Sequence, residues 1–182
     1  MKIPSREECY RLLDKYNFPE KKKKHVELVA KVAVFLGEKI KDKGDEVNIA
    51  LVYAGGILHD IDKGLMEEGD IHTDKGVKIL EEEGYPEVAR ICVSHRVDAF
   101  LDPKTIPTTW EEKCIALADK MVKDEIIGVT ERFRLWNEEN LPEEQKEILR
   151  KSYPLVKDLE REILGIIGIG WEEIKFLKFK IN

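Results

Sequence analysis

Cysteines and long apolar runs are both scarce in this sequence. Its three cysteines, Cys9, Cys92 and Cys114, cannot all pair and form no Cys-x-x-Cys motif, so we expect reduced thiols and a cytoplasmic protein. No apolar run approaches the roughly 18 residues that a membrane span needs, and the N-terminal segment lacks the apolar stretch of a signal peptide. These absences argue against a disulfide-stabilised, secreted or membrane-bound protein.

Basic residues are outnumbered by acidic ones. The chain has 31 Lys and Arg against 37 Asp and Glu, a net charge of −6, which disfavours non-specific binding to nucleic acid because like charges repel. We therefore expect no stable nucleic-acid partner, and a phosphorylated ligand would need local positive charge or a metal ion. The run Lys21 to Lys24 either forms a solvated face or steers such a ligand. Nothing in the composition selects an oligomeric state.

Helix signals dominate the sequence, and no alternating strand pattern of useful length occurs. The helix over about 47–60 is nearly all apolar, which is typical of the centre of a core. Its Gly55-Gly56 pair predicts close approach of a neighbouring helix or of the functional site. The fold class is therefore all-α. We expect helices over about residues 5–16, 19–43, 47–60, 73–83, 86–95 and 109–125, and two or three more in the remainder, where Pro142, Pro154 and Gly165 act as breaks.

The chain has only four histidines, His25, His59, His72 and His95, and each lies beside a strongly apolar helical segment. We therefore expect each of them to point inward at the end of an element. His59 is followed at once by Asp60. Imidazole and carboxylate groups are the ligands that divalent first-row metals and Mg²⁺ share. The pattern predicts a metal site and, with it, a metal-dependent hydrolase.

Asp119 provides the sharpest physical argument for that site. The helix expected over about 109–125 places Asp119 on the same face as Ile126 and other apolar residues. A carboxylate on an apolar face is costly unless it is paired or bound to a metal. Lys120 and Lys123 are the alternative partners.

The order of these residues resembles that of the HD superfamily of metal-dependent phosphohydrolases. The resemblance covers roughly residues 20–135, and the segment between His72 and His95 resembles the small HDIG-type branch. Asp62 stands where that branch has a glycine, which leaves the ligands untouched but changes the charge beside the site. The resemblance implies an all-α HD-domain helical bundle with additional C-terminal helices. In these terms the chain is a single domain, residues 1–182, with an HD core at about 20–135 and a C-terminal helical appendage at about 136–182.

The resemblance also implies roles for individual residues. His25, His59, Asp60 and Asp119 would hold one divalent ion, while His72 and His95 would hold a second or contact substrate phosphate. Asp60, which can bridge two ions, and Lys63 would be catalytic. Because the ligands are imidazole and carboxylate without thiolate, one or two ions of Mn, Fe, Co, Ni or Mg are expected. The residues expected to contact substrate phosphate are Lys63, Arg96 and Arg132.

The function implied is hydrolysis of a phosphate ester or anhydride by metal-activated water. A small phosphorylated molecule is the expected partner, and a nucleotide is the expected substrate. Two alternatives stay open. A dinuclear-iron oxygenase of the HD type would keep the same ligands, and a nucleotide-binding sensor would bind metal and nucleotide without turnover.

Overall fold

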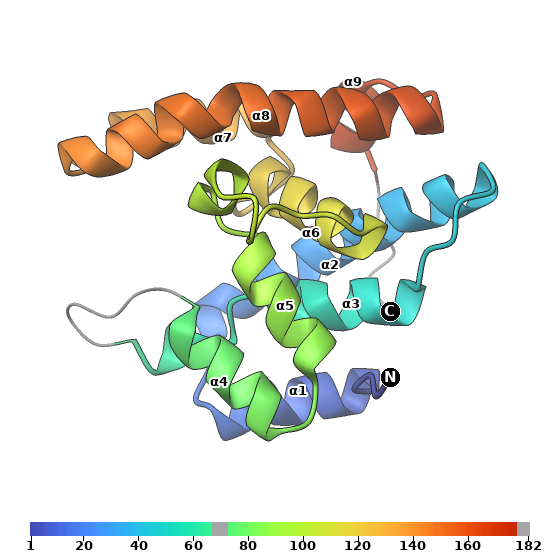
Figure 1. Ribbon diagram of the computed structural model, residues 1–182, viewed down its shortest axis with the longest axis vertical. Helices are drawn as coiled ribbons and strands as arrows, with labels where there is room; N and C mark the ends of the chain where they lie inside the picture. The colour runs from blue at the N-terminus through green and yellow to red at the C-terminus, as the bar shows by residue number, and fades with distance from the viewer. Residues whose placement is uncertain (67–72, 178–182) are drawn as a thin grey trace.

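The computed structural model describes residues 1–66 and 73–177, and these residues confirm the predicted all-α class (Figure 1). Within these ranges there is no β-strand, only an isolated bridge between Val122 and Ile126. His72, one of the predicted metal ligands, lies outside the described residues. The helices are α1 (Arg6–Lys15), α2 (Glu20–Asp42), α3 (Ile49–Leu58), η1 (Ile61–Gly64), α4 (Asp74–Glu82), α5 (Pro86–Ser94), η2 (Asp98–Leu101), α6 (Trp110–Met121), α7 (Val129–Glu138), α8 (Glu143–Ile167) and α9 (Trp171–Lys175).

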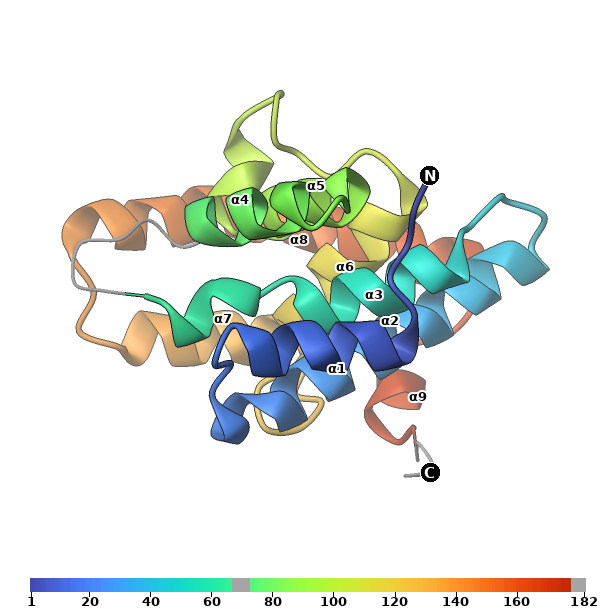
Figure 2. The same ribbon diagram turned by 90° about the horizontal axis from the view of Figure 1, so that it is seen from below.

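Helices α2, α3, α5 and α6 form the centre of the molecule. The longest of them, α2, packs against both α3 and α6, while α3 also contacts α5 and α6. Helices α1 and α4 lie along one edge, and α8 runs along the opposite edge with α7 beside it (Figure 1). Seen from the direction of Figure 2, α1 crosses α3, and α4 lies beside α5. No helix in the described part of the chain is long and apolar enough to cross a membrane.

The glycine pair in α3 lets three helices approach it closely, as the sequence predicts. A Cβ atom added at Gly56 would lie 2.5 Å from the Cα of Ala30 in α2. One added at Gly55 would lie 2.5 Å from Ile115 in α6 and 2.6 Å from Ile91 in α5. At Gly56 the backbone of α2 leaves no room for a side chain, and at Gly55 a side chain would displace both isoleucines. The glycines therefore set how tightly the helices that carry the histidines and aspartates pack together.

Helix α6 ends at Met121, earlier than the predicted end near residue 125. The Met121 carbonyl accepts a hydrogen bond from the N–H of Ile127 at 2.8 Å, and Val122 pairs with Ile126 across a tight turn. Ile126 therefore does not continue the helical face that carries Asp119, and that part of the prediction is wrong. The reversal is made by pairing between residues on both sides of the turn, which a helical period does not encode.

Pro154 and Gly165 lie inside α8 and do not break it, which corrects a second prediction. Both residues are exposed, whereas Val156 and Ile163 on the opposite face are buried. Proline removes one backbone hydrogen bond from a helix, but the carbonyl that loses its donor belongs to Arg150, on the exposed face of the helix. Burial of the apolar face stabilises α8 by more than Pro154 and Gly165 destabilise it.

Candidate metal centre

Side chains from several helices converge on one buried point. Nε2 of His25 lies 3.1 Å from Oδ1 of Asp119, and Nε2 of His59 lies 3.6 Å from the same oxygen. The ligand atoms of His25, His59 and Asp60 all lie within 4.8 Å of one another. The fold thus brings together residues up to 94 positions apart in the sequence. The group comprises His25 from α2, His59 and Asp60 at the end of α3, His95 at the end of α5 and Asp119 from α6.

Asp60 lies between two histidines. Its Oδ2 is 3.9 Å from Nε2 of His59, and its Oδ1 is 3.7 Å from Nε2 of His95. The ammonium of Lys63 lies 4.0 Å from Oδ1. The two carboxylate oxygens therefore face different imidazoles, which is the orientation required of a carboxylate that bridges two ions.

The histidines at the ends of α3 and α5 are oriented by backbone carbonyls. Nδ1 of His59 lies 2.8 Å from the oxygen of Gly56, and Nδ1 of His95 lies 3.3 Å from that of Ile91. A carbonyl oxygen only accepts, so Nδ1 carries the proton and Nε2 presents its lone pair to the centre. Metal-binding histidines commonly have their second nitrogen held in this way.

His25 is oriented by the early end of α6. Its Nδ1 lies 3.1 Å from the carbonyl oxygen of Lys123, which comes two residues after the last residue of the helix. Had α6 continued to residue 125, this carbonyl would point along the helix axis towards the next turn. The observed end of α6 at Met121, which the sequence did not predict, therefore lets the carbonyl of Lys123 face His25.

A divalent ion fits the arrangement of these donors. His59 is 1% exposed, and its Nε2 has no hydrogen-bond partner. Two ligand atoms about 2.1 Å from one ion at angles of about 90–110° are about 3.0–3.4 Å apart. The separations of 3.1 and 3.6 Å from Asp119 to His25 and His59 are close to that range. The donors are nitrogen and oxygen, a set that suits Mn, Fe, Co, Ni or Mg.

Lys120 is a buried cation beside the centre. It is 1% exposed, and its ammonium donates to Oδ2 of Asp119 at 2.6 Å and to the carbonyl of His95 at 2.5 Å. The sequence offers Lys120 as an alternative to metal as the partner of Asp119. The structure accommodates both partners, because Lys120 takes one carboxylate oxygen and leaves the other facing His25 and His59.

The surroundings set the protonation states of the centre. Burial lowers the pKa of His25, but the hydrogen bond and negative charge of Asp119 raise it, and the net shift is upward. Burial lowers the pKa of His95 to about 4. Burial raises the pKa of Asp119, but the charge of Lys120, the hydrogen bond with His25 and the neighbouring His59 hold it well below its usual range. At pH 7 Asp119 is therefore ionised and His95 neutral, as metal binding requires.

Asp62, at the position of the motif glycine, is fully buried. Its Oδ2 accepts a hydrogen bond from the backbone N–H of Thr73 at 2.5 Å. Thr73 has a φ of 85° and makes no side-chain hydrogen bond that caps α4. The carboxylate of Asp62 instead fixes the start of α4 beside the centre.

The centre opens into a pocket of about 950 Å³, called the metal pocket below. Lys21 and Lys22 at the start of α2 line it, whereas Lys23 pairs with Asp14 and Glu20. Part of the predicted lysine run therefore reaches the pocket. The local positive charge that a phosphorylated ligand needs on an acidic protein is present. Seven basic side chains line the metal pocket: Lys21, Lys22, Lys63, Arg96, Lys120, Lys123 and Arg132.

The two arginines predicted to contact phosphate lie in different settings. The guanidinium of Arg96 makes two hydrogen bonds to the carboxylate of Asp98. The guanidinium of Arg132 lies over the ring of Trp136, 4.3 Å from its centre, and no carboxylate of the described residues forms an ion pair with it. Trp136 was missed in the sequence, although its spacing of four residues from Arg132 is the signal that places both on one helical face.

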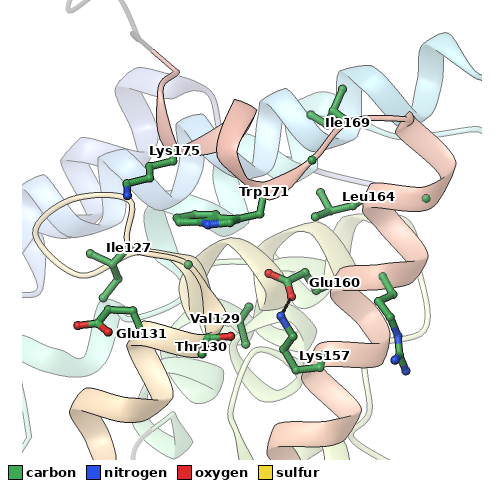
Figure 3. Close-up of a pocket in the computed structure, with 14 residues that line it drawn as sticks. Ile127, Val129, Thr130, Glu131, Lys157, Glu160, Leu164, Ile169, Trp171 and Lys175 are labelled. Carbon is green, nitrogen blue, oxygen red and sulfur yellow. Dashed lines mark hydrogen bonds and ion pairs between the residues drawn. The ribbon is translucent and has the colours of Figure 1, made fainter.

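A second pocket of about 730 Å³, called the α9 pocket below, lies between the start of α7, α8 and α9 (Figure 3). The indole of Trp171 covers Gly128, where an added Cβ atom would lie 2.9 Å from the ring. Lys157 and Glu160 in this pocket pair with each other (Figure 3). Among the described residues, no histidine and none of the residues that the sequence predicts for the site line it.

Comparison with known proteins agrees with the fold and the motif. The HD domain model matches residues 23–124. The chain is 34% identical over 140 residues to an uncharacterized protein of Methanocaldococcus jannaschii, an alignment that covers 69% of this chain and 82% of that protein. It is 27% identical over 184 residues to a tRNA (cytidine(56)-2'-O)-methyltransferase of Picrophilus torridus, covering 94% of this chain but 50% of that protein. No solved structure matches the chain significantly.

The match to the HD domain covers more than half of the chain and contains all the described histidines and aspartates of the centre. The chain spans only about half the length of the methyltransferase relative. The protein belongs to the HD domain family, and so to a superfamily of metal-dependent hydrolases.

Proposed function

We propose that this protein is a metal-dependent phosphohydrolase that cleaves a phosphate ester or anhydride, with a nucleotide as its substrate. The observation that supports this most directly is that His25, Asp60 and Asp119, which converge with the buried His59, line the same pocket as seven basic side chains. The metal donors and the positive charges line one cavity. A phosphoryl group in that cavity meets both at once.

The proposed ligands of the first ion are His25, His59, Asp60 and Asp119. The orientation of Asp60 towards His95 supports a second ion held by His95 together with His72, which lies outside the described residues. When bound, a divalent ion supplies a water of lowered pKa and positive charge opposite the phosphoryl oxygens.

The protein's own side chains bind and orient the phosphate. Lys63, whose ammonium lies 4.0 Å from Asp60, is placed to donate to a phosphoryl oxygen next to the ligands. Lys21, Lys22 and Lys123 add positive charge around the pocket, which attracts an anionic ligand. Arg132, with no ion-pair partner among the described residues, is a further hydrogen-bond donor to the substrate. Because Arg96 is engaged with Asp98, its part is the weaker one.

The test is reconstitution followed by turnover. Metal-free protein is loaded separately with Mn, Fe, Co, Ni and Mg, its metal content is measured, and phosphate release is assayed on nucleotides and simple phosphate esters. We expect hydrolysis with at least one metal and a loss of about a thousandfold in Asp60→Asn, which removes a ligand charge. The matched control is Asp124→Asn, because Asp124 is an exposed carboxylate in the same pocket.

The outcomes separate the proposal from its alternatives. Full metal content and full activity in Asp60→Asn would contradict the assignment of the site. Nucleotide binding without turnover under every metal would favour the sensor. If the iron-loaded protein consumes its substrate only in the presence of oxygen and releases no phosphate, the oxygenase would be favoured.

A further inference from the structure

Part of the metal pocket is built from helices that follow the matched HD region. That region ends at residue 124, whereas α7 and α8 begin at Val129 and Glu143. These lining residues are mostly apolar or aromatic, unlike the lysines near the metal ligands. The α7–α8 wall, as it is called here, comprises Arg132, Trp136, Glu139, Leu141, Gln145, Ile148 and Leu149.

Trp136 and Arg132 form a stacked pair on α7. They are four residues apart and so lie on one face of the helix, with the guanidinium 4.3 Å from the centre of the indole ring. Buried Phe133 meets the ring of Trp136 edge-on, at 5.2 Å and an interplanar angle of 81°. The indole is therefore held in place while it remains partly exposed to the pocket.

The guanidinium of Arg132 has no ion-pair partner among the described residues. Its Nε is buried and has no hydrogen-bond partner, and no ion pair with a carboxylate of the described residues satisfies the guanidinium. The guanidinium lines the metal pocket and has further N–H groups, so a ligand there can accept hydrogen bonds from Arg132 without breaking an ion pair.

Helix α8 supplies the rest of the wall. Gln145, Ile148 and Leu149 are spaced three and four residues apart, which places them on one face of the helix. Two of the three are apolar, and the amide of Gln145 both donates and accepts. A surface of this kind suits a flat apolar ring with polar atoms at its edge.

We infer that the α7–α8 wall binds the heteroaromatic ring of the substrate, that is, a nucleobase, with Trp136 as the stacking residue. The inference deepens the proposed function and rests on it for the position of the phosphate beside the metal ligands. Stacking on an aromatic side chain tolerates any base, whereas hydrogen bonds from Arg132 and Gln145 reach heteroatoms at the ring edge. An aliphatic phosphate ester would leave both the stack and these donors without a partner.

The test compares two substrates that differ only in the ring, adenosine 5′-monophosphate and ribose 5-phosphate. We expect the protein to favour the nucleotide in kcat/KM by at least about tenfold. Trp136→Leu, which keeps an apolar side chain but removes the ring, should lower kcat/KM for the nucleotide about tenfold and leave ribose 5-phosphate within about twofold. Trp136→Phe should retain most of the preference. Trp110→Leu is the matched control, because Trp110 lies in the first turn of α6 and lines neither pocket.

Each outcome bears on one proposal at a time. Equal kcat/KM for the two substrates, or equal losses on both in Trp136→Leu, would overturn the ring site and leave the hydrolase standing. If neither ester is hydrolysed, calorimetric titration of the same two compounds into the metal-loaded protein replaces the assay. Weaker binding of the nucleotide alone in Trp136→Leu would then support the ring site independently of hydrolysis, and equal binding of the two compounds would overturn it.

Discussion

The metal pocket and the α9 pocket are similar in size, about 950 and 730 Å³, but differ in how their polar groups are satisfied. In the α9 pocket Lys157 pairs with Glu160, and Lys175 lies over the ring of Trp171. Next to the metal pocket, behind the lining residue Asp119, Nε2 of His59 is buried without a hydrogen bond. A cavity becomes a candidate site when donors and acceptors converge on it without satisfying one another, and volume alone does not distinguish the two.

The largest expected difference between the pockets concerns activity. His59→Ala removes a donor from the centre and should lower metal content and reduce phosphate release about a thousandfold. Glu160→Gln, the corresponding change in the α9 pocket, should leave both within about twofold of the original protein. Elemental analysis and a phosphate-release assay on the two purified variants check this. A loss of activity in Glu160→Gln as large as in His59→Ala would contradict the assignment of activity to the metal pocket alone.

The two pockets also differ in the depth of their lysine–carboxylate pairs. The side chain of Lys120 is 2% exposed, whereas that of Lys157 is 33% exposed, although its partner Glu160 is buried. Removing one partner of a buried pair costs about 3–5 kcal/mol, and solvent that reaches the lysine of a pair reduces this cost. Lys120→Met should therefore lower the unfolding free energy of the metal-free protein by about 3 kcal/mol, and Lys157→Met should lower it by less.

Metal provides the internal control for that result. A bound cation compensates the charge of Asp119, so loading should reduce the penalty of Lys120→Met and leave that of Lys157→Met unchanged. Urea unfolding with and without metal measures all four values. The same penalty for Lys120→Met in both states would show that Lys120 and the metal do not share Asp119.

Removal of the metal should lower stability by a smaller amount. Without an ion, His59 keeps a buried nitrogen without a partner, and ligand release costs stability according to metal affinity. For a domain of this size about 1 kcal/mol corresponds to about 2–4 °C, so chelation should lower the melting temperature by several degrees. Glu160→Gln should show the same drop as the original protein, and His59→Ala should show none.

Acid should destabilise the metal-free protein through His95. Its folded pKa is about 4, below the ordinary value of about 6.5, so between these values the unfolded chain binds more protons. Stability from this group is complete above about pH 6.5 and is lost as the pH falls towards about 4. From pH 7 to pH 5 the loss should be about 2 kcal/mol, and it should be absent in His95→Gln.

Urea unfolding of the two proteins at both pH values, in the presence of chelator, measures this difference. The raised pKa of His25 contributes with the opposite sign, because its stabilisation is complete at low pH and lost as the pH rises. That contribution is present in both proteins and cancels in the comparison. Equal pH slopes for the two proteins would show that His95 is not held neutral by burial.

Much of this contrast was predictable from the sequence, because it depends on residue order. The sequence predicts that the doublet His59-Asp60 and the later Asp119 belong to the metal centre. The structure brings them together with His25. Their role as metal ligands stays a prediction. The all-α class also followed from local patterns, as did the close approach of helices at Gly55.

Other features depend on contacts between distant segments, which no local pattern carries. The end of α6 is set by pairing of Val122 with Ile126, and only that end presents the carbonyl of Lys123 to His25. Pro154 continues a helix because its buried face outweighs one lost hydrogen bond. The position of Trp136 in the metal pocket likewise follows from the packing of α7 and α8.

The smallest expected difference between the two pockets concerns substrate affinity. Lys63 lines the metal pocket with its ammonium 4.0 Å from Asp60, whereas Lys175 lines the α9 pocket. A charge-assisted hydrogen bond to phosphate is worth roughly 1.5 kcal/mol, so Lys63→Ala should raise KM about tenfold. Lys175→Ala removes the same charge from the chain and should leave KM within about twofold.

Steady-state kinetics of Lys63→Ala and Lys175→Ala, at one salt concentration, decide the matter. Because both variants change the net charge equally, any general effect of charge on the approach of an anion cancels between them. A raised KM in Lys175→Ala alone would place the substrate in the α9 pocket, and the convergence of unsatisfied donors would then fail as a guide to the site. A raised KM in Lys63→Ala alone ties substrate phosphate to the pocket that holds the His and Asp centre.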